Sequence, residues 1–174
     1  MKNFKALALA ALTLAATIAP TAQAQVADRV VTPARVPATH RALAQAITNV
    51  GVTIYDGRNT KECKANEEGR LMGYYDGHAN YMVLCTNNGT MDELLVTLTH
   101  EAVHMVQDCR TGGIKSNKVQ PATEWKKLVS YLNDQHVNEI QAFYPEHKWG
   151  HEVEARAFEL SPNQVAAGIG AYCF

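Results

Sequence analysis

The sequence predicts an α+β fold, in which a small antiparallel sheet containing a β-hairpin is followed by helices. Two observations lead to this prediction. Short strand-like segments bounded by glycine lie between residues 51 and 85, and segments with apolar residues at three- and four-residue spacing follow from residue 90 onward. Strands that precede a run of helices, without alternating with them, are typical of α+β chains.

The N-terminus has the features of a secretory signal peptide. Two lysines precede an apolar run from Ala6 to Ala19, which is too short to span a bilayer comfortably. The small-x-small pattern Ala22-Gln23-Ala24 follows, so we expect residues 1–24 to be removed and the chain to be exported to the periplasm or secreted. The alternative is an uncleaved anchor, but we expect no stable membrane insertion after cleavage.

The remaining chain is long enough for one domain. Residues 25–37 contain Pro33 and Pro37 and little periodicity, so we expect a flexible leader there and a single domain over residues 38–174. The formal net charge of −1 gives no reason to expect nucleic acid as a partner.

The first predicted elements are a short helix and three strands. Apolar residues recur at helical spacing from Thr39 to Thr48, and "GVTIYDG" at residues 51–57 reads as a strand. Residues 71–85 read as two strands around Asp76-Gly77, a dipeptide that favours a tight hairpin turn.

A long helix is predicted next. Thr90 and Glu93 match a capping box, in which each side chain binds a backbone N–H at the helix start. Apolar residues then recur at three- and four-residue steps until Gly112-Gly113 ends the pattern.

Further helices are predicted towards the C-terminus. One helical region runs from Thr123 to Phe143, with a break near Asn133-Asp134, and stops before Pro145. The segment "HEVEARAFEL" at residues 151–160 has good helix formers, and Ser161-Pro162 then suits the cap and first turn of a last short helix.

Four cysteines remain in a chain that we expect to be exported: Cys63, Cys85, Cys109 and Cys173. Thiols in such compartments are oxidised, so two disulfides are expected. Three connectivities are possible, and we favour Cys63 with Cys85 and Cys109 with Cys173. The spacing contains no Cys-x-x-Cys, which argues against a zinc-cysteine site.

The long helix carries the motif His-Glu-x-x-His as His100, Glu101 and His104. Residues four apart lie on one helical face, so both imidazoles can bind one zinc ion. Glu101 lies beside the first ligand and can reach a zinc-bound water as general base. The alternative is that the three residues form only a solvated polar face.

A catalytic zinc site normally has a third protein ligand, and we expect it on the helix that contains "EVEARAF". Glu152 and Glu154 are the candidates. Because they are two residues apart on a helix, they point about 200 degrees apart and only one of them can bind. The other, like Glu159, is expected to be an exposed helix carboxylate.

The chain resembles the gluzincins in these motifs, over roughly residues 70–160. In gluzincins a glutamate on a later helix completes a zinc site begun by His-Glu-x-x-His, within a signature such as Glu-x-x-Ala-Asp. The stretch "EVEARAF" is similar if Glu152 is the ligand, which favours His100, His104 and Glu152 as the zinc set. Arg156 stands where the family has Asp or Asn, so the group that orients a zinc histidine is unassigned. Small peptidases of this build include the lethal-factor-like and ImmA/IrrE-like groups.

The resemblance implies a zinc metalloendopeptidase that acts on a peptide or protein substrate, with Glu101 as general base. Gluzincins commonly lay substrate along an edge strand, which we expect at Asn80 to Cys85. Tyr144, His147 and His151 are candidate transition-state donors. His147 and His151 also stand four apart, but we favour capping or surface roles over a second metal pair. The alternative function is an exported zinc-containing binding or immunity-like module without peptidase activity.

Overall fold

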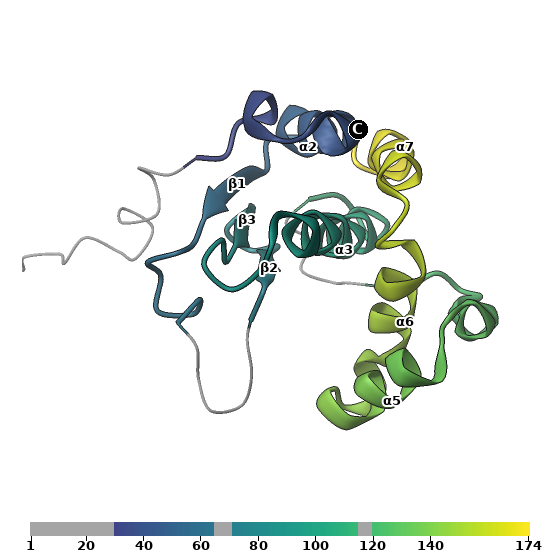
Figure 1. The fold of residues 1–174 in the computed structure, drawn as a ribbon. Coiled ribbons are helices and arrows are strands. Elements are labelled where there is room, and N and C mark those ends of the chain that lie inside the picture. Colours follow the sequence, from purple (N-terminus) through teal and green to yellow (C-terminus); the bar gives the residue numbers. More distant parts are fainter. Residues whose placement is uncertain (1–29, 65–70, 115–119) are drawn as a thin grey trace, which may run out of the picture.

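The computed structural model describes residues 30–64, 71–114 and 120–174. Within these ranges the chain has the predicted α+β fold, in which a small sheet is followed by a long helix and C-terminal helices (Figure 1). The predicted signal peptide at residues 1–24 lies outside the described residues. No described helix is both long enough and apolar enough to cross a membrane.

The sheet is mixed, whereas the sequence predicted an antiparallel one. In the described part of the chain it contains β1 (Thr53–Asp56), β2 (Gly73–Asp76) and β3 (Tyr81–Leu84), in the order β1-β3-β2. β2 and β3 pair antiparallel as the predicted hairpin, but β1 pairs parallel to β3. The pairing of β1 depends on a long connection, so no local turn signal could reveal its direction.

The hairpin turn is longer than predicted. Asp76 pairs with Tyr81, so residues 77–80 form the turn in place of a two-residue connection. Asn80 adopts a left-handed conformation with φ of 59°, which asparagine tolerates better than most residues. The side chain of Asp76 also accepts a hydrogen bond from the backbone N–H of Ala79, at 2.9 Å.

The motif helix, α3, spans Met91–Cys109. Its predicted capping box is confirmed, because the Thr90 Oγ1 accepts from the Glu93 backbone and the Glu93 carboxylate accepts from the Thr90 backbone at 2.7 Å. The helix ends three residues before Gly112-Gly113, and both glycines have positive φ. The capping box thus fixes where the motif lies along the helix.

The predicted C-terminal helices are present. They comprise α4 (Trp125–Leu128), η3 (Val129–Tyr131), α5 (Asp134–Phe143), η4 (Glu146–Lys148), α6 (Trp149–Phe158) and α7 (Pro162–Tyr172). The break at Asn133 is confirmed, since this side chain caps α5. Pro162 occupies the first turn of α7, but Ser161 makes no side-chain cap bond, so that part of the prediction is wrong.

Helix α3 lies at the centre of the fold. It contacts β2 and β3 on one side and α6 and α7 on the other, while α2 (Ala38–Asn49) packs beside α7 (Figure 1). The core contains buried side chains from several of these elements, among them Leu43 and Ile47 of α2, Ile54 of β1, Met82 of β3, Leu98 and Met105 of α3, and Ile169 of α7. Burial of this apolar face holds the polar face of α3 in place.

Residues 30–37 are not a flexible leader, so the prediction is wrong for this part. Val30 forms a β-bridge with Tyr55, and the Val31 N–H donates to the Ile54 carbonyl at 2.8 Å. The short helix η2 (Pro33–Arg35) follows, and Val36 is buried in the core. The two prolines break periodicity, but their neighbours still supply apolar side chains and backbone donors.

Both favoured disulfides are present. Cys63 pairs with Cys85, which ties the loop after β1 to the end of β3. Cys109 pairs with Cys173, which ties the C-terminal end of α7 to the last residue of the motif helix. Two disulfides are consistent with folding in an oxidising compartment.

Candidate metal centre

The three motif residues lie on the half-buried face of α3. Leu98, Ala102 and Met105 of the same helix are buried in the core. His100 and His104 retain side-chain exposures of 13% and 17%. Their rings meet edge to face, with centroids 5.0 Å apart. The four-residue spacing therefore places both imidazoles side by side, as the sequence predicted.

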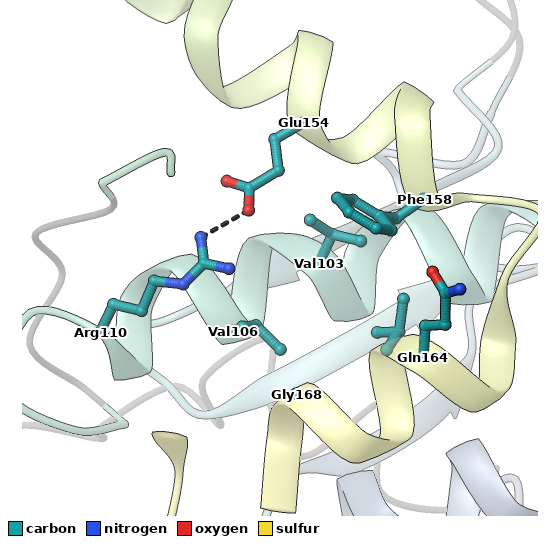
Figure 2. A pocket seen from close by; sticks show the side chains of 8 residues that line it. Val103, Val106, Arg110, Glu154, Phe158, Gln164 and Gly168 are labelled. Carbon is teal, nitrogen blue, oxygen red and sulfur yellow. Dashed lines mark hydrogen bonds and ion pairs between the residues drawn. The ribbon is translucent and has the colours of Figure 1, made fainter. Parts of the chain in front are cut away.

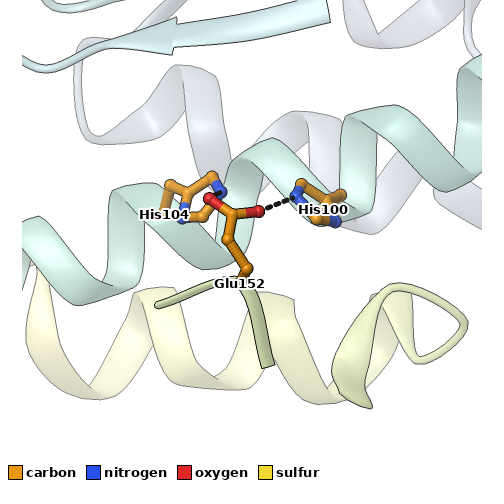
Figure 3. A group of neighbouring side chains, drawn as sticks. All are labelled: His100, His104 and Glu152. Atoms are coloured by element: carbon orange, nitrogen blue, oxygen red, sulfur yellow. Dashed lines mark ion pairs between the residues drawn. The ribbon is translucent and has the colours of Figure 1, made fainter. Parts of the chain in front are cut away.

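Helix α6 brings Glu152 between the two histidines (Figure 3). One carboxylate oxygen lies 3.4 Å from His100 Nε2 and the other lies 3.7 Å from His104 Nε2. One ligand atom from each of the three residues falls within 4.8 Å of the others. Glu152 is only 8% exposed at its side chain. The three residues therefore form a group that could hold a metal ion.

The second nitrogen of each ring is occupied by a buried acceptor. His100 Nδ1 donates to Glu159 at 3.0 Å. His104 Nδ1 lies 2.9 Å from Gln107 Oε1, and the Gln107 amide nitrogen donates to the His151 carbonyl and to Glu154. Because the amide nitrogen is already used, Oε1 must accept from the His104 ring. When its ring is neutral, each histidine can therefore carry the proton on Nδ1, which leaves the Nε2 lone pair available to a metal ion.

The carboxylates set the electrostatics of His100. Burial lowers its pKa, but hydrogen bonds with Glu152 and Glu159 and the charge of Glu101 outweigh this and raise the pKa to about 9. Burial likewise favours the neutral form of Glu152, yet the hydrogen bond with His100 and the charge of His104 hold the Glu152 pKa below its usual range. The site is therefore negative enough to attract a cation.

Glu154 does not belong to this group of three, and its carboxylate faces Arg110 (Figure 2). Its carboxylate forms an ion pair with Arg110 at 2.5 Å, and it also accepts from Gln107 and from the Ala122 backbone N–H at 2.8 Å. Glu154 is 1% exposed, so the prediction that the non-ligand glutamate lies on the surface is wrong. Its partners compensate the burial of its charge.

Glu159 is also buried, contrary to the prediction of an exposed carboxylate. Besides His100, it accepts from Arg156 at 3.3 Å, and Arg156 also approaches Glu139 of α5 at 3.6 Å. Burial raises the pKa of Glu159, but the His100 hydrogen bond and the charge of Arg156 hold it below its usual range. Glu159 thus orients the histidine, while Arg156 orients Glu159.

Glu101 faces the strand that borders the site. Its carboxylate accepts from the Tyr75 backbone N–H at 3.0 Å, and the Tyr75 hydroxyl donates to Asp108 at 3.1 Å. A Cβ at Gly73 would lie 2.7 Å from the Thr97 side chain, so glycine allows β2 to approach α3 this closely. Strand β2 is therefore anchored along the motif helix.

The expectation that Asn80 to Cys85 form the edge strand is wrong. β3 lies between β1 and β2, so β2 is the edge beside the motif helix. The Cys85 N–H donates to the Met72 carbonyl, and hydrogen-bonded pairs alternate along an antiparallel ladder. The backbone groups of Gly73 and Tyr75 therefore point away from β3, as the Tyr75 bond to Glu101 also shows.

Two cavities flank the three clustered residues along β2. One, of about 230 Å³, is lined by Met72 and Gly73 together with His100, Glu101 and Tyr144. Burial and the charges of Glu152 and Glu101 raise the pKa of Tyr144 to about 12, so its hydroxyl is a proton donor. The other cavity, of about 290 Å³, contains His104 and Glu152 in its wall.

His147 and His151 line the second cavity. Among the described residues, the one group of three side chains that could hold a metal ion is His100, His104 and Glu152, so His147 and His151 do not form a second metal cluster there. Tyr144 is thus the one predicted donor that shares a cavity with Glu101.

Sequence reasoning missed two residues of the site, Glu159 and Gln107. Gln107 follows His104 by three residues, a spacing at which helical side chains meet, so this contact carried a signal. Glu159 follows Glu152 by seven residues, which is two helical turns on the same face. Its contact with His100 depends on the packing of α6 against α3, which local spacing does not reveal.

The fold and the cluster define an α+β protein with a candidate metal centre between two helices. The chain belongs to a family described as Domain of unknown function (DUF8637), whose pattern matches residues 36–174. No curated protein matched the chain, and neither did any solved structure.

Proposed function

We propose that the protein is a zinc-dependent metallopeptidase, exported from the cytoplasm, in which His100, His104 and Glu152 hold the metal. The observation that carries this proposal is the convergence of two Nε2 atoms and one carboxylate beside Glu101. The alternative is a zinc-containing binding or immunity-like module that cleaves nothing.

The donor set suits zinc in kind and spacing. Ligands of a tetrahedral zinc ion lie about 3.3 Å apart, given metal–ligand bonds of about 2.0–2.1 Å. The histidines lie 3.4 and 3.7 Å from different oxygens of Glu152, and one ligand atom from each of the three residues lies within 4.8 Å of the others. The group would therefore contract by about 1.5 Å at most to reach the zinc spacing. The buried acceptors on both Nδ1 atoms are the arrangement that commonly orients zinc histidines. Three protein ligands leave a fourth position for water, as in catalytic sites.

The neighbouring side chains suit peptide hydrolysis. Bound zinc would supply a Lewis acid that acidifies water and polarises a scissile carbonyl. Glu101, in the wall of the cavity beside His100, would take the proton of the attacking water and pass it to the leaving nitrogen. The Tyr144 hydroxyl, in the same cavity, would donate a hydrogen bond to the developing oxyanion.

Strand β2 supplies a place for the substrate backbone. Gly73, whose N–H and C=O groups point outward, lines the cavity beside His100, and Tyr75, whose carbonyl points outward, lines the cavity beside His104. An extended peptide could add to this edge as a further strand and cross the cluster from one cavity to the other. If the hydrogen bond between Glu101 and the Tyr75 N–H then broke, the Glu101 carboxylate would be available to act as the base and the Tyr75 N–H to bind the peptide.

A matched pair of variants tests the metal site. We expect the purified mature protein to contain one zinc ion, Glu152→Gln to lose it, and Glu154→Gln to retain it, as measured by mass spectrometry of the metal under native conditions. Both variants remove one charge two residues apart on α6. If Glu154→Gln lost zinc while Glu152→Gln retained it, Glu154 and not Glu152 would be the ligand.

A second measurement tests catalysis. The wild type and Glu101→Gln are incubated with a broad peptide library, and the products are identified by mass spectrometry. We expect cleavage by the wild type only, with equal zinc in both proteins. Equal cleavage by the two proteins would remove the proposed mechanism, and zinc binding without any cleavage by the wild type would favour the binding module.

A further inference from the structure

The wall of the cavity beside His104 is rich in basic side chains. Besides His104 and Glu152, it is lined by Tyr75 of β2, by Gly77 of the hairpin turn and by three basic residues, His147, Lys148 and His151. The basic residues come from η4 and the first turn of α6. The positive end of the α6 dipole lies at this same wall.

The acidic groups in the wall of this cavity and directly behind it are already engaged. Glu152 lies between His100 and His104. Asp108, behind Gly77, is fully buried and accepts from the Tyr75 hydroxyl. In the described part of the chain the ammonium of Lys148 has no carboxylate within ion-pair distance. The positive charge of Lys148 is therefore directed to solvent and to whatever fills the cavity.

We propose that this cavity binds a carboxylate of the substrate next to the bond that is cleaved. The proposal rests on the proposed peptidase function and names its substrate class: peptides that carry an aspartate or glutamate side chain, or a free C-terminal carboxylate, at this position. Lys148 supplies the charge, and the His147 ring supplies an N–H donor in either protonation state.

The position of the cavity limits which substrate group can reach it. It shares His104 and Glu152 with the metal cluster, while the cavity on the other side shares His100 with the cluster and also contains Glu101. A peptide paired with β2 places its scissile bond between the two cavities. The group that enters the cavity beside His104 then belongs to a residue that flanks this bond.

The test measures binding separately from cleavage. The probes are four dye-labelled octapeptides of one sequence, which carry Glu or Gln at one central position and a carboxylate or carboxamide at the C-terminus. Their affinity for zinc-supplemented Glu101→Gln is measured by fluorescence anisotropy. The same variant carrying Lys148→Glu or His147→Gln is compared with a control carrying Lys61→Glu, which makes the same charge change in the exposed loop after β1.

A carboxylate probe is expected to bind on the order of tenfold more tightly than its amide partner, as for a hydrogen bond to a charged group. This preference is lost in Lys148→Glu, reduced in His147→Gln and kept in Lys61→Glu. A preference for the central Glu identifies a side-chain subsite, and a preference for the free C-terminus identifies a terminal-carboxylate subsite. Equal binding of all four probes, or a preference unchanged in Lys148→Glu, overturns the proposal. Since binding is measured in Glu101→Gln, absence of cleavage by the wild type would reject only the peptidase mechanism.

Discussion

Removal of the Glu159 carboxylate is expected to weaken zinc binding by about 10- to 100-fold, the usual cost of losing a group that orients a metal ligand. In free energy this is about 1.4–2.7 kcal/mol. Two variants at this position are expected to fall at opposite ends of this range. Glu159→Gln keeps an oxygen that can accept from His100 Nδ1 at 3.0 Å, so it belongs near the lower limit. Glu159→Ala removes the acceptor and leaves a buried N–H unpaired, so it belongs near the upper limit.

The assay is competition for zinc against a chromophoric chelator at neutral pH, with circular dichroism to establish that each variant is folded. Glu139→Gln is the matched control. Glu139 belongs to the same network but touches Arg156 rather than His100, at 3.6 Å. Its removal is expected to change zinc affinity less than about fivefold, because partly exposed ion pairs contribute about 0–1 kcal/mol.

Two results would refute this reasoning. A folded Glu159→Ala variant with wild-type zinc affinity would show that the His100 ring needs no acceptor at Nδ1. An equal loss in Glu139→Gln and Glu159→Gln would show that the effect follows net charge near the site and not the orientation of the ring.

Three further predictions concern the surroundings of the site. Tyr75→Phe is expected to lower the free energy of unfolding by about 1–3 kcal/mol in urea titrations, because the buried Asp108 loses its hydroxyl donor; an unchanged midpoint would contradict this role. Cys109→Ser with Cys173→Ser removes a link across 64 residues, and chain entropy predicts a loss of about 4 kcal/mol, seen as a lower melting temperature without reductant; an unchanged melting temperature would contradict this. Tyr144→Phe is expected to lower kcat on the order of 10²-fold with unchanged zinc content; unaltered kcat would exclude it as the oxyanion donor.

Elements with local signals could be predicted from the sequence. The capping box at Thr90 involves residues three apart, and the β2–β3 hairpin joins neighbouring segments. The pairing of His100 with His104 also follows from local geometry, because residues four apart share a helical face. Helical periodicity separates Glu152 from Glu154 by about 200 degrees, but it was the resemblance to gluzincins that favoured Glu152. If one of these carboxylates faces His100, the other must point away from His100.

The features that could not be predicted depend on contacts between distant segments. The parallel pairing of β1 with β3 makes β2 the edge strand, and hydrophobic alternation is the same for either strand order. The burial of Glu154 depends on Arg110, 44 residues away, and that of Glu159 depends on His100, 59 residues away. A charged helical residue normally predicts exposure, and only tertiary partners reverse that expectation.

The two glutamates of α6 have different roles in the site: Glu152 faces the histidines, and Glu154 fixes the position of the helix. Glu154 binds Arg110, Gln107 and the Ala122 backbone, and these bonds hold α6 in one register against α3. That register places Glu152 between the histidines. Gln107 belongs to both networks, because it accepts from His104 and donates to Glu154. A shift of α6 that broke the ion pair between Glu154 and Arg110 would leave a buried charge without a partner, which costs free energy. The same shift would move Glu152 out of the metal cluster, so the ion pair also stabilises the position of Glu152.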